Sequence, residues 1–176
     1  MNPPAASPPA AAPASGFRRF VFGRNLRFTL LRAAALAGVC FVVFKFILLP
    51  VRITGASMEP NYRDGRINLI NTLAYRNHPP RRGDVVGIRF SGPSLMLLKR
   101  VVGLPGERIG FREGRVTVNG LPLDEPWLRH VSNWNLDPVE LGPDEYFVVG
   151  DNRSMPMHLH TFGRAERVRI LGKAVL

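Results

Sequence analysis

The chain is poor in cysteine, because Cys40 is the only one among its 176 residues. A single thiol excludes a disulfide framework and a cysteine-based metal site within the chain. The histidines include one close pair, His158 and His160. No acidic cluster lies near this pair in the sequence to complete a set of ligands, so we expect no metal.

Acidic residues are also scarce, with 13 against 24 basic ones and a net charge of +11. The first acidic residue is Glu59, so the N-terminal third carries positive charge alone. Such asymmetry is typical of a segment that faces a membrane. A surface for nucleic acid would need aromatic residues interleaved with the basic ones, and the C-terminal part lacks them. We therefore expect a lipid bilayer as partner and no nucleic acid.

The N-terminal part divides into three segments by composition. Residues 1–16 are nearly all Pro, Ala and Ser, which predicts a disordered tail. Residues 17–32 are basic, and residues 33–51 are apolar apart from Lys45. As a helix, the apolar segment approximately matches a hydrocarbon core of roughly 30 Å. Lys45 could extend its amine to the interface, and Pro50 is a plausible end of the helix.

Residues 33–51 have three possible interpretations. A cleaved signal peptide would have a shorter apolar core and a small-residue cleavage site. A buried helix of a soluble protein is the second possibility. We favour an uncleaved signal anchor, because the five arginines before it keep the N-terminus cytoplasmic. The protein would then cross the inner (plasma) membrane once, with residues 52–176 on the outer, periplasmic side.

The pattern beyond residue 51 is that of β-structure. Short apolar runs are separated by Gly, Pro, Asn and Asp turns, and no long helical period follows residue 60. The runs cover residues 66–71, 84–90, 95–102, 108–111, 115–118, 146–149 and 168–171. Asn119-Gly120 predicts a tight hairpin. The sequence therefore predicts a mainly β domain of antiparallel sheets around one core, preceded by one transmembrane helix.

Lys99 is a basic residue in a run otherwise suited to a buried strand. A charged amine is costly there unless it becomes neutral or finds a partner. The usual pKa of lysine is about 10.4, and burial would lower it. A neutral amine can take the proton of a serine hydroxyl and later give it to a leaving amine. Ser57, which follows the apolar segment, is the candidate nucleophile.

Both residues also have ordinary explanations. Lys99 could lie on an edge strand with its amine in water, and Ser57 could be a simple turn residue. If the pair reacts, the backbone N–H of Ser57 is the natural oxyanion donor. A substrate would bind as an added strand between the segments that flank the pair. The candidate substrate-binding residues are Ile53, Thr54, Gly55, Met58, Met96, Leu97 and Leu98.

Four segments together resemble bacterial type I signal peptidases, a family of membrane-bound Ser-Lys peptidases. They are residues 55–60, 82–86, 99–107 and 146–153. The resemblance implies a serine endopeptidase that removes signal peptides from exported preproteins after small residues. It implies that Ser57 is the nucleophile and Lys99 the general base. It also implies a β-rich catalytic domain, no cofactor, and signal-peptide-bearing preproteins as partners. We expect a monomer.

The sequence departs from the family pattern after residues 150–153. The family usually continues with a serine, an aspartate and an arginine, where this chain has Pro156, His158 and His160. Pro156 has no hydroxyl to orient the lysine. Some members also carry a serine two residues before the nucleophile, where Gly55 stands, so the second oxyanion donor is unidentified.

Other residues near these departures are candidates for support of the site. We expect Asp151, Asn152 and Arg153 to brace the loop beside Lys99, and we hypothesise a supporting role for His158. Ser154, Asp151 or a histidine could supply the hydrogen bond that Pro156 cannot make.

Three alternatives follow from the same features. The first is a Ser-Lys peptidase with narrower substrates, such as a pilin or conjugation-protein processing enzyme. The second is a catalytically inactive, membrane-tethered domain that binds preproteins, which the altered residues 154–160 favour. The third is a self-cleaving repressor, and the lack of a DNA-binding helical region argues against it.

Overall fold

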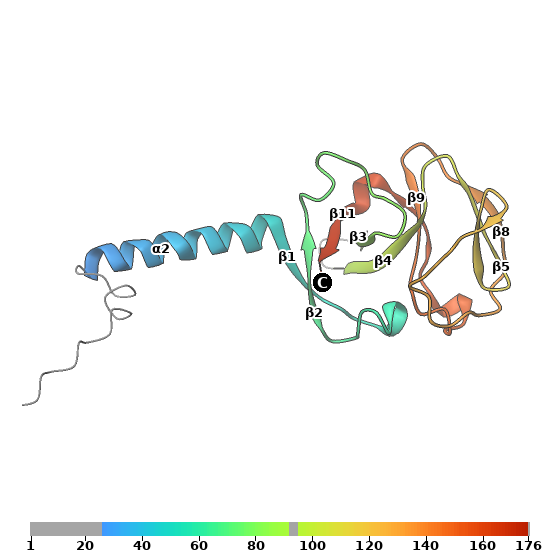
Figure 1. Ribbon diagram of the computed structural model, residues 1–176, viewed down its shortest axis with the longest axis horizontal. Helices are drawn as coiled ribbons and strands as arrows, with labels where there is room; N and C mark the ends of the chain where they lie inside the picture. The colour runs from blue at the N-terminus through green and yellow to red at the C-terminus, as the bar shows by residue number, and fades with distance from the viewer. Residues whose placement is uncertain (1–25, 92–94, 176) are drawn as a thin grey trace, which may run out of the picture. The chain divides into compact units, whose positions relative to one another are not determined.

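The computed structural model describes residues 26–91 and 95–175 (Figure 1). The tail predicted at residues 1–16 and most of the basic segment predicted at 17–32 lie outside the described residues. The chain divides into two compact units, Met1–Val42 and Val43–Leu176.

One long apolar helix precedes the strands. Helix α2 spans Leu26–Val42 and continues as the π-helical η1, Val43–Ile47. The stretch Arg27–Ile47 has 21 residues, and by length and composition it could cross a membrane. The helix ends earlier than the predicted segment 33–51, because its last four residues belong to the first strand. Pro50 explains this limit, since proline lacks the N–H that a helix interior needs.

Seven strands form one antiparallel sheet in the order β1–β2–β11–β3–β4–β9–β10 (Figure 1). These strands are β1 (Leu48–Arg52), β2 (Ile67–Asn71), β3 (Val85–Ser91), β4 (Leu95–Gly103), β9 (Glu145–Val149), β10 (Gly163–Glu166) and β11 (Ile170–Val175). Strand β4 lies inside this sheet, between β3 and β9. The backbone of β4 is hydrogen-bonded to a strand on each side. Its register is therefore fixed, and so is the direction of its side chains.

A smaller sheet has four strands in the order β7–β6–β5–β8. They are β5 (Arg108–Arg112), β6 (Arg115–Val118), β7 (Leu121–Pro122) and β8 (Leu136–Glu140). Three single turns of 3₁₀ helix complete the domain: η2 (Ala56–Met58), η3 (Met157–Leu159) and η4 (Arg167–Arg169). The predicted fold class, mainly β with antiparallel sheets after an N-terminal helix, is confirmed.

The predicted hairpin also forms. Asn119 and Gly120 both have positive φ, 52° and 85°, and they join β6 to β7. A two-residue turn of this kind needs positive φ at both positions, which the Asn-Gly pair accepts readily.

The strands that the sequence patterns missed all lie at sheet edges. They are β1, β8 and β10. Strand β8 contains Pro138, which is tolerated there because an edge strand has unpaired backbone groups. The run predicted at residues 168–171 is shifted, because Arg167–Arg169 form a 3₁₀ turn and β11 begins at Ile170.

The interior consists of three apolar clusters, so the prediction of one core was wrong. Strands β4 and β9 supply alternate residues to two of them. Val101 and Val148 belong to a cluster within the large sheet, whereas Val102 and Phe147 belong to a cluster shared with the small sheet. The third cluster lies around Met58 and Ile70. Because successive side chains of a strand point to opposite faces, β4 and β9 contribute residues to the clusters on both faces of the large sheet.

The two tryptophans contribute to packing in the domain. Trp134 is buried in the cluster shared by the two sheets, and its indole N–H donates to the carbonyl of Met155 at 3.0 Å. Trp127 packs against the same cluster, and its ring centroid lies 4.7 Å from the Arg100 guanidinium carbon. Both rings therefore pack within the domain, Trp134 inside the shared cluster and Trp127 against it.

Two valines give a matched test of this packing. Val102 is 0% exposed in β4, and Val168 is 81% exposed in η4. We expect Val102→Ala to lower the free energy of unfolding by roughly 2 kcal/mol, because buried methyl groups are lost and a cavity remains. Val168→Ala should change it by less than about 0.5 kcal/mol. Denaturant unfolding of the full chain measures both, and equal effects would contradict the packing described here.

Candidate active site

Ser57 lies in the turn η2, which is held at both ends. Gly55, the residue before this turn, has a φ of 96°, a backbone conformation that residues with a side chain rarely adopt. Its N–H donates to Asp64 Oδ1 at 2.9 Å. From the other side, the Asn152 side-chain amide donates to the carbonyl of Ala56 at 3.0 Å. The backbone N–H of Asn152 donates to the carbonyl of Ser57 at 3.0 Å. The backbone that carries the Ser57 hydroxyl is therefore fixed before any substrate binds.

Lys99 lies in the interior strand β4 and is 2% exposed. Its Nζ donates to Ser57 Oγ at 2.8 Å. Burial lowers the pKa of the Lys99 amine to about 8, and the negative charge of Asp151 opposes that shift. At pH 7 a lysine with this pKa is neutral roughly 300-fold more often than an ordinary one. The structure thus brings the two sequence-predicted residues into direct contact.

Asp151 connects the loop after β9 to the strand that carries Lys99. It is almost fully buried, and Arg100 binds it through two nitrogens, Nε to Oδ1 at 2.8 Å and Nη2 to Oδ2 at 2.5 Å. Asn61 adds a hydrogen bond to Asp151 Oδ2 at 2.8 Å. Two-point pairing of this kind fixes geometry as well as charge. Because Arg100 is the next residue after Lys99, the pairing sets the position of the loop relative to the amine.

Arg153 is 0% exposed and supports the loop after β9 through its guanidinium group. Its Nη2 pairs with Glu125 Oε1 at 2.5 Å, and its Nε donates to the carbonyl of Gly150 at 2.9 Å. Gly150 must be glycine, because a Cβ there would lie 2.1 Å from the carbonyl oxygen of Ser57. This close approach keeps the loop against the Ser57 turn.

The structure does not bring His158 to this group. Its side chain is exposed on the turn η3, whereas His160 is 5% exposed. The His160 ring lies edge-on to Trp134 at 4.9 Å between centroids. Burial and the nearby charges of Lys99 and Arg153 lower the pKa of His160 to about 4, so it is neutral at ordinary pH. The structure therefore does not support the hypothesis about His158, because the 3₁₀ turn directs position 158 outward.

Among residues 26–91 and 95–175, none takes the place of the hydroxyl that Pro156 lacks. Ser154 is exposed, and its hydroxyl pairs with Asn152 Oδ1 at 2.5 Å. Within the described part of the chain, Lys99 Nζ makes no side-chain hydrogen bond other than that to Ser57. The burial of the Lys99 stem in β4 orients the amine instead.

A small cavity of about 40 Å³ opens beside the Ser57 hydroxyl, and we call it the Ser57 cavity. Its lining includes all seven residues predicted to bind substrate, together with Val51, Arg52 and Ser57 itself. This volume is close to that of one water molecule in the liquid, about 30 Å³, so it suits an alanine-sized group.

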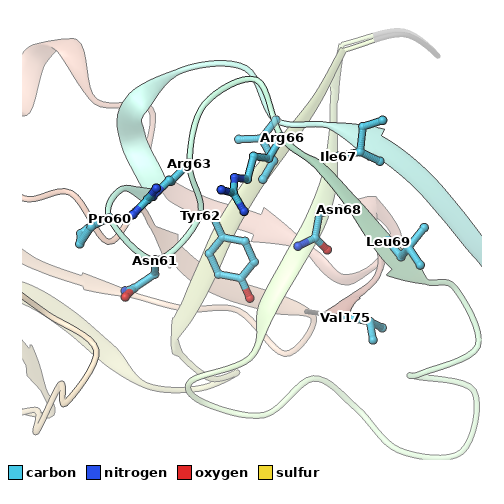
Figure 2. A pocket seen from close by; sticks show the side chains of 10 residues that line it. Pro60, Asn61, Tyr62, Arg63, Arg66, Ile67, Asn68, Leu69 and Val175 are labelled. Atoms are coloured by element: carbon cyan, nitrogen blue, oxygen red, sulfur yellow. The ribbon is translucent and has the colours of Figure 1, made fainter.

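A larger cavity of about 560 Å³ lies along β2 (Figure 2). Tyr62, Arg63, Arg66 and Asn68 are among the side chains that line it, and Ile53 is the residue it shares with the Ser57 cavity. Neither Ser57 nor Lys99 lines it. No group of acidic, histidine or cysteine side chains suited to a metal occurs among residues 26–91 and 95–175.

Comparison with known proteins identifies the family. Residues 26–176 match the family described as signal peptidase, peptidase S26. Signal peptidase I of Leptolyngbya laminosa is 33% identical over 132 residues, which cover 70% of this chain and 65% of the relative. Signal peptidase I V of Bacillus subtilis is 32% identical over 157 residues, covering 78% and 92%. The chain therefore belongs to the signal peptidase family, as its motifs indicated.

Coverage differs among these proteins. The matched part spans just under two thirds of the Leptolyngbya relative and 59% of a probable signal peptidase I-2 from Synechocystis. A crystal structure of a signal peptidase I from Enterococcus faecalis is 25% identical, with a TM-score of 0.42, and covers 53% of this chain and 95% of that one.

Burial of the Lys99 amine, which is protonated in water, should lower the free energy of unfolding. The apolar substitution Lys99→Met tests this penalty. The folded-state pKa of about 8 lies below the unfolded value of about 10.4, so unfolding takes up a proton between these values. The penalty is full below pH 8 and disappears above pH 10.4. We expect Lys99→Met to raise the free energy of unfolding at pH 7 by up to about 3 kcal/mol, and to lose this advantage as the pH rises.

Denaturant unfolding of both proteins from pH 7 to 10.5 measures that difference. Lys173→Met is the control, since Lys173 is half-exposed and pairs with Asp84 at 2.7 Å. A Lys99→Met protein that is less stable than the parent at pH 7 would contradict a desolvated amine.

Proposed function

We propose that this protein is a membrane-anchored serine endopeptidase that removes signal peptides from exported preproteins. The observation that carries the proposal is the 2.8 Å hydrogen bond between a buried, readily deprotonated Lys99 and the hydroxyl of Ser57. Membership of the signal peptidase family supports the same reaction and the same class of substrate. No cofactor enters the mechanism.

The reaction begins with transfer of a proton from Ser57 to neutral Lys99. The Ser57 oxygen attacks the carbonyl carbon of the scissile peptide bond, and the backbone N–H of Ser57 donates to the oxyanion that forms. The Lys99 ammonium then gives its proton to the leaving nitrogen, and the bond breaks to leave an ester on Ser57. Lys99 next takes a proton from water, and the hydroxide attacks the ester carbonyl carbon. The Lys99 ammonium then returns its proton to the departing Ser57 oxygen, which releases the carboxylic acid product and regenerates the Ser57 hydroxyl and the neutral amine.

Substrate specificity follows from the Ser57 cavity. A substrate strand that pairs with the backbone near Ile53 and Met96 would place one side chain in this cavity. The cavity is small, about 40 Å³, which favours an alanine-sized side chain over a leucine. Cleavage after small residues is the expected result.

The supporting residues hold this geometry and do not activate the amine. Asp151 raises the pKa of Lys99, opposite to what a general base requires. Its role is to fix Arg100 and the loop, while Asn152 fixes the Ser57 turn and Arg153 supports Gly150.

The helix at Arg27–Ile47 would anchor the enzyme in the membrane. The basic residues before and early in the helix favour a cytoplasmic N-terminus, with the β domain on the outer side. Preproteins would then present their cleavage sites at the membrane surface. The protein would work there as a monomer.

One observation favours a catalytically inactive, preprotein-binding domain as a second candidate. Pro156 stands where a hydroxyl would orient the lysine, and no described side chain replaces it. The direct contact between Lys99 and Ser57 favours the enzyme, because that geometry is already in place without the hydroxyl.

Cleavage of a labelled preprotein by the detergent-solubilised full chain distinguishes the two. The parent should cleave after a small residue, and Ser57→Ala and Lys99→Ala should each lose at least about a thousandfold in kcat/KM. Ser132→Ala and Lys173→Ala, which lie outside the site, serve as matched controls and should retain activity. Binding without cleavage by the parent would support the inactive domain, and cleavage that survives loss of Ser57 would exclude it as nucleophile.

A further inference from the structure

A third cavity, of about 70 Å³, is lined by Lys99, and we call it the Lys99 cavity. Its apolar lining comes from four strands of the large sheet and from the loop before β10. These residues are Ile88, Leu97, Val148, Phe162 and Ala165. It is an apolar space beside an amine, and the mechanism described so far gives it no occupant.

Each of the two small cavities is lined by one member of the Ser57–Lys99 pair. Ser57 lines the Ser57 cavity and Lys99 does not, whereas Lys99 lines the Lys99 cavity and Ser57 does not. Leu97 is the residue they share. Both linings include Leu97 of β4, so the two cavities are neighbours along this strand.

Acyl transfer assigns the two halves of a substrate to the two reacting residues. The carbonyl carbon bonds to the Ser57 oxygen, so the signal-peptide side must lie at Ser57. The leaving nitrogen receives its proton from Lys99, so the first residue of the released chain must lie beside the amine. The Lys99 cavity is the space that the structure provides there.

The rim of the Lys99 cavity is positively charged. Arg89, Arg164 and Arg169 line it, and no acidic side chain does. Arg164 lies 3.7 Å from Glu145, and Arg169 lies 3.7 Å from Glu166. Both arginines are about half exposed, so these pairs are weak and leave the guanidinium groups available to a ligand. No ion pair involves Arg89 within the described residues.

We propose that the Lys99 cavity binds the side chain of the first residue after the scissile bond, and that its arginine rim favours acidic residues at the next two positions. This inference rests on the proposed function. A volume of about 70 Å³ holds roughly two water molecules, so the first side chain should be small, up to about the size of valine. The larger cavity of Figure 2 does not compete for this role, since neither reacting residue lines it.

Three peptides that differ only after the scissile bond test the proposal. They share a signal-peptide segment that ends in Ala and continue with Ala-Glu-Glu, Ala-Ser-Ser or Ala-Lys-Lys. For the parent, kcat/KM should be highest for the acidic peptide and lowest for the basic one, by about two- to fivefold for each arginine that a carboxylate reaches. The Arg89→Glu, Arg169→Glu double variant should reverse this order.

A double variant with the same change of charge provides the matched control. Arg76 and Arg115 are exposed and line none of the cavities described here. Arg76→Glu, Arg115→Glu should keep the preference of the parent. If both double variants shift the preference equally, the net charge of the protein would be responsible and the proposed subsite would be wrong.

Binding to Ser57→Ala protein, measured by fluorescence anisotropy, separates this inference from the proposed function. The acidic peptide should bind more tightly than the basic one. When Arg89→Glu and Arg169→Glu are added to the Ser57→Ala protein, the order of the two affinities should invert. If the parent cleaves all three peptides equally and the affinities are equal, the subsite is wrong while the proposed function stands. If the parent cleaves none, the proposed function fails, and the affinities alone decide whether the arginine rim selects acidic chains.

Discussion

The structure depends on holding an amine out of water beside a hydroxyl. Lys99 Nζ lies 2.8 Å from Ser57 Oγ, and the lysine is 2% exposed. In water the same amine would be protonated and could not act as a base. The desolvation that makes it useful also destabilises the folded chain, so the rest of the domain must offset this penalty.

The interior position of β4 provides that environment. The strand is paired on both edges, and its side chains alternate between two apolar clusters. Arg100, the residue after the buried lysine, binds Asp151 from the loop after β9. That loop in turn fixes the Ser57 turn through Asn152, and Gly150 allows the two backbones to touch. Three segments far apart in the sequence therefore meet with little freedom around Lys99 and Ser57.

The sequence pointed to Ser57 and Lys99, which the structure brings into contact, because the signals around both residues are local. A lysine in a buried strand is conspicuous, and short motifs surround both Ser57 and Lys99. The residues expected to bind substrate are neighbours of this pair in the sequence, and the structure places all seven around one cavity. Short apolar runs between turn residues indicated the interior strands, although the run at residues 168–171 overlaps β11 only in part.

Features that depend on distant contacts were harder to predict. The edge strands β1, β8 and β10 pair on one side only, and β1 and β8 each contain a proline. The turn at residues 157–159 exposes His158, whereas His160 is buried. Both residues are histidines and only one residue separates them, so the sequence alone provides no basis for telling them apart. The Lys99 cavity needs residues from several strands, so no single motif could reveal it.

Direct titration of the Lys99 amine by NMR is the most direct test. Lys45, Lys99 and Lys173 are the only lysines in the sequence, so protein labelled with ¹³C at the lysine ε carbon gives few signals. The Lys99→Met variant assigns the signal of Lys99, and Lys173 is the internal comparison. We predict a midpoint near pH 8 for Lys99, well below the usual lysine value of about 10.4. A Lys99 midpoint near 10.4 would show an ordinary solvated amine and contradict the mechanism.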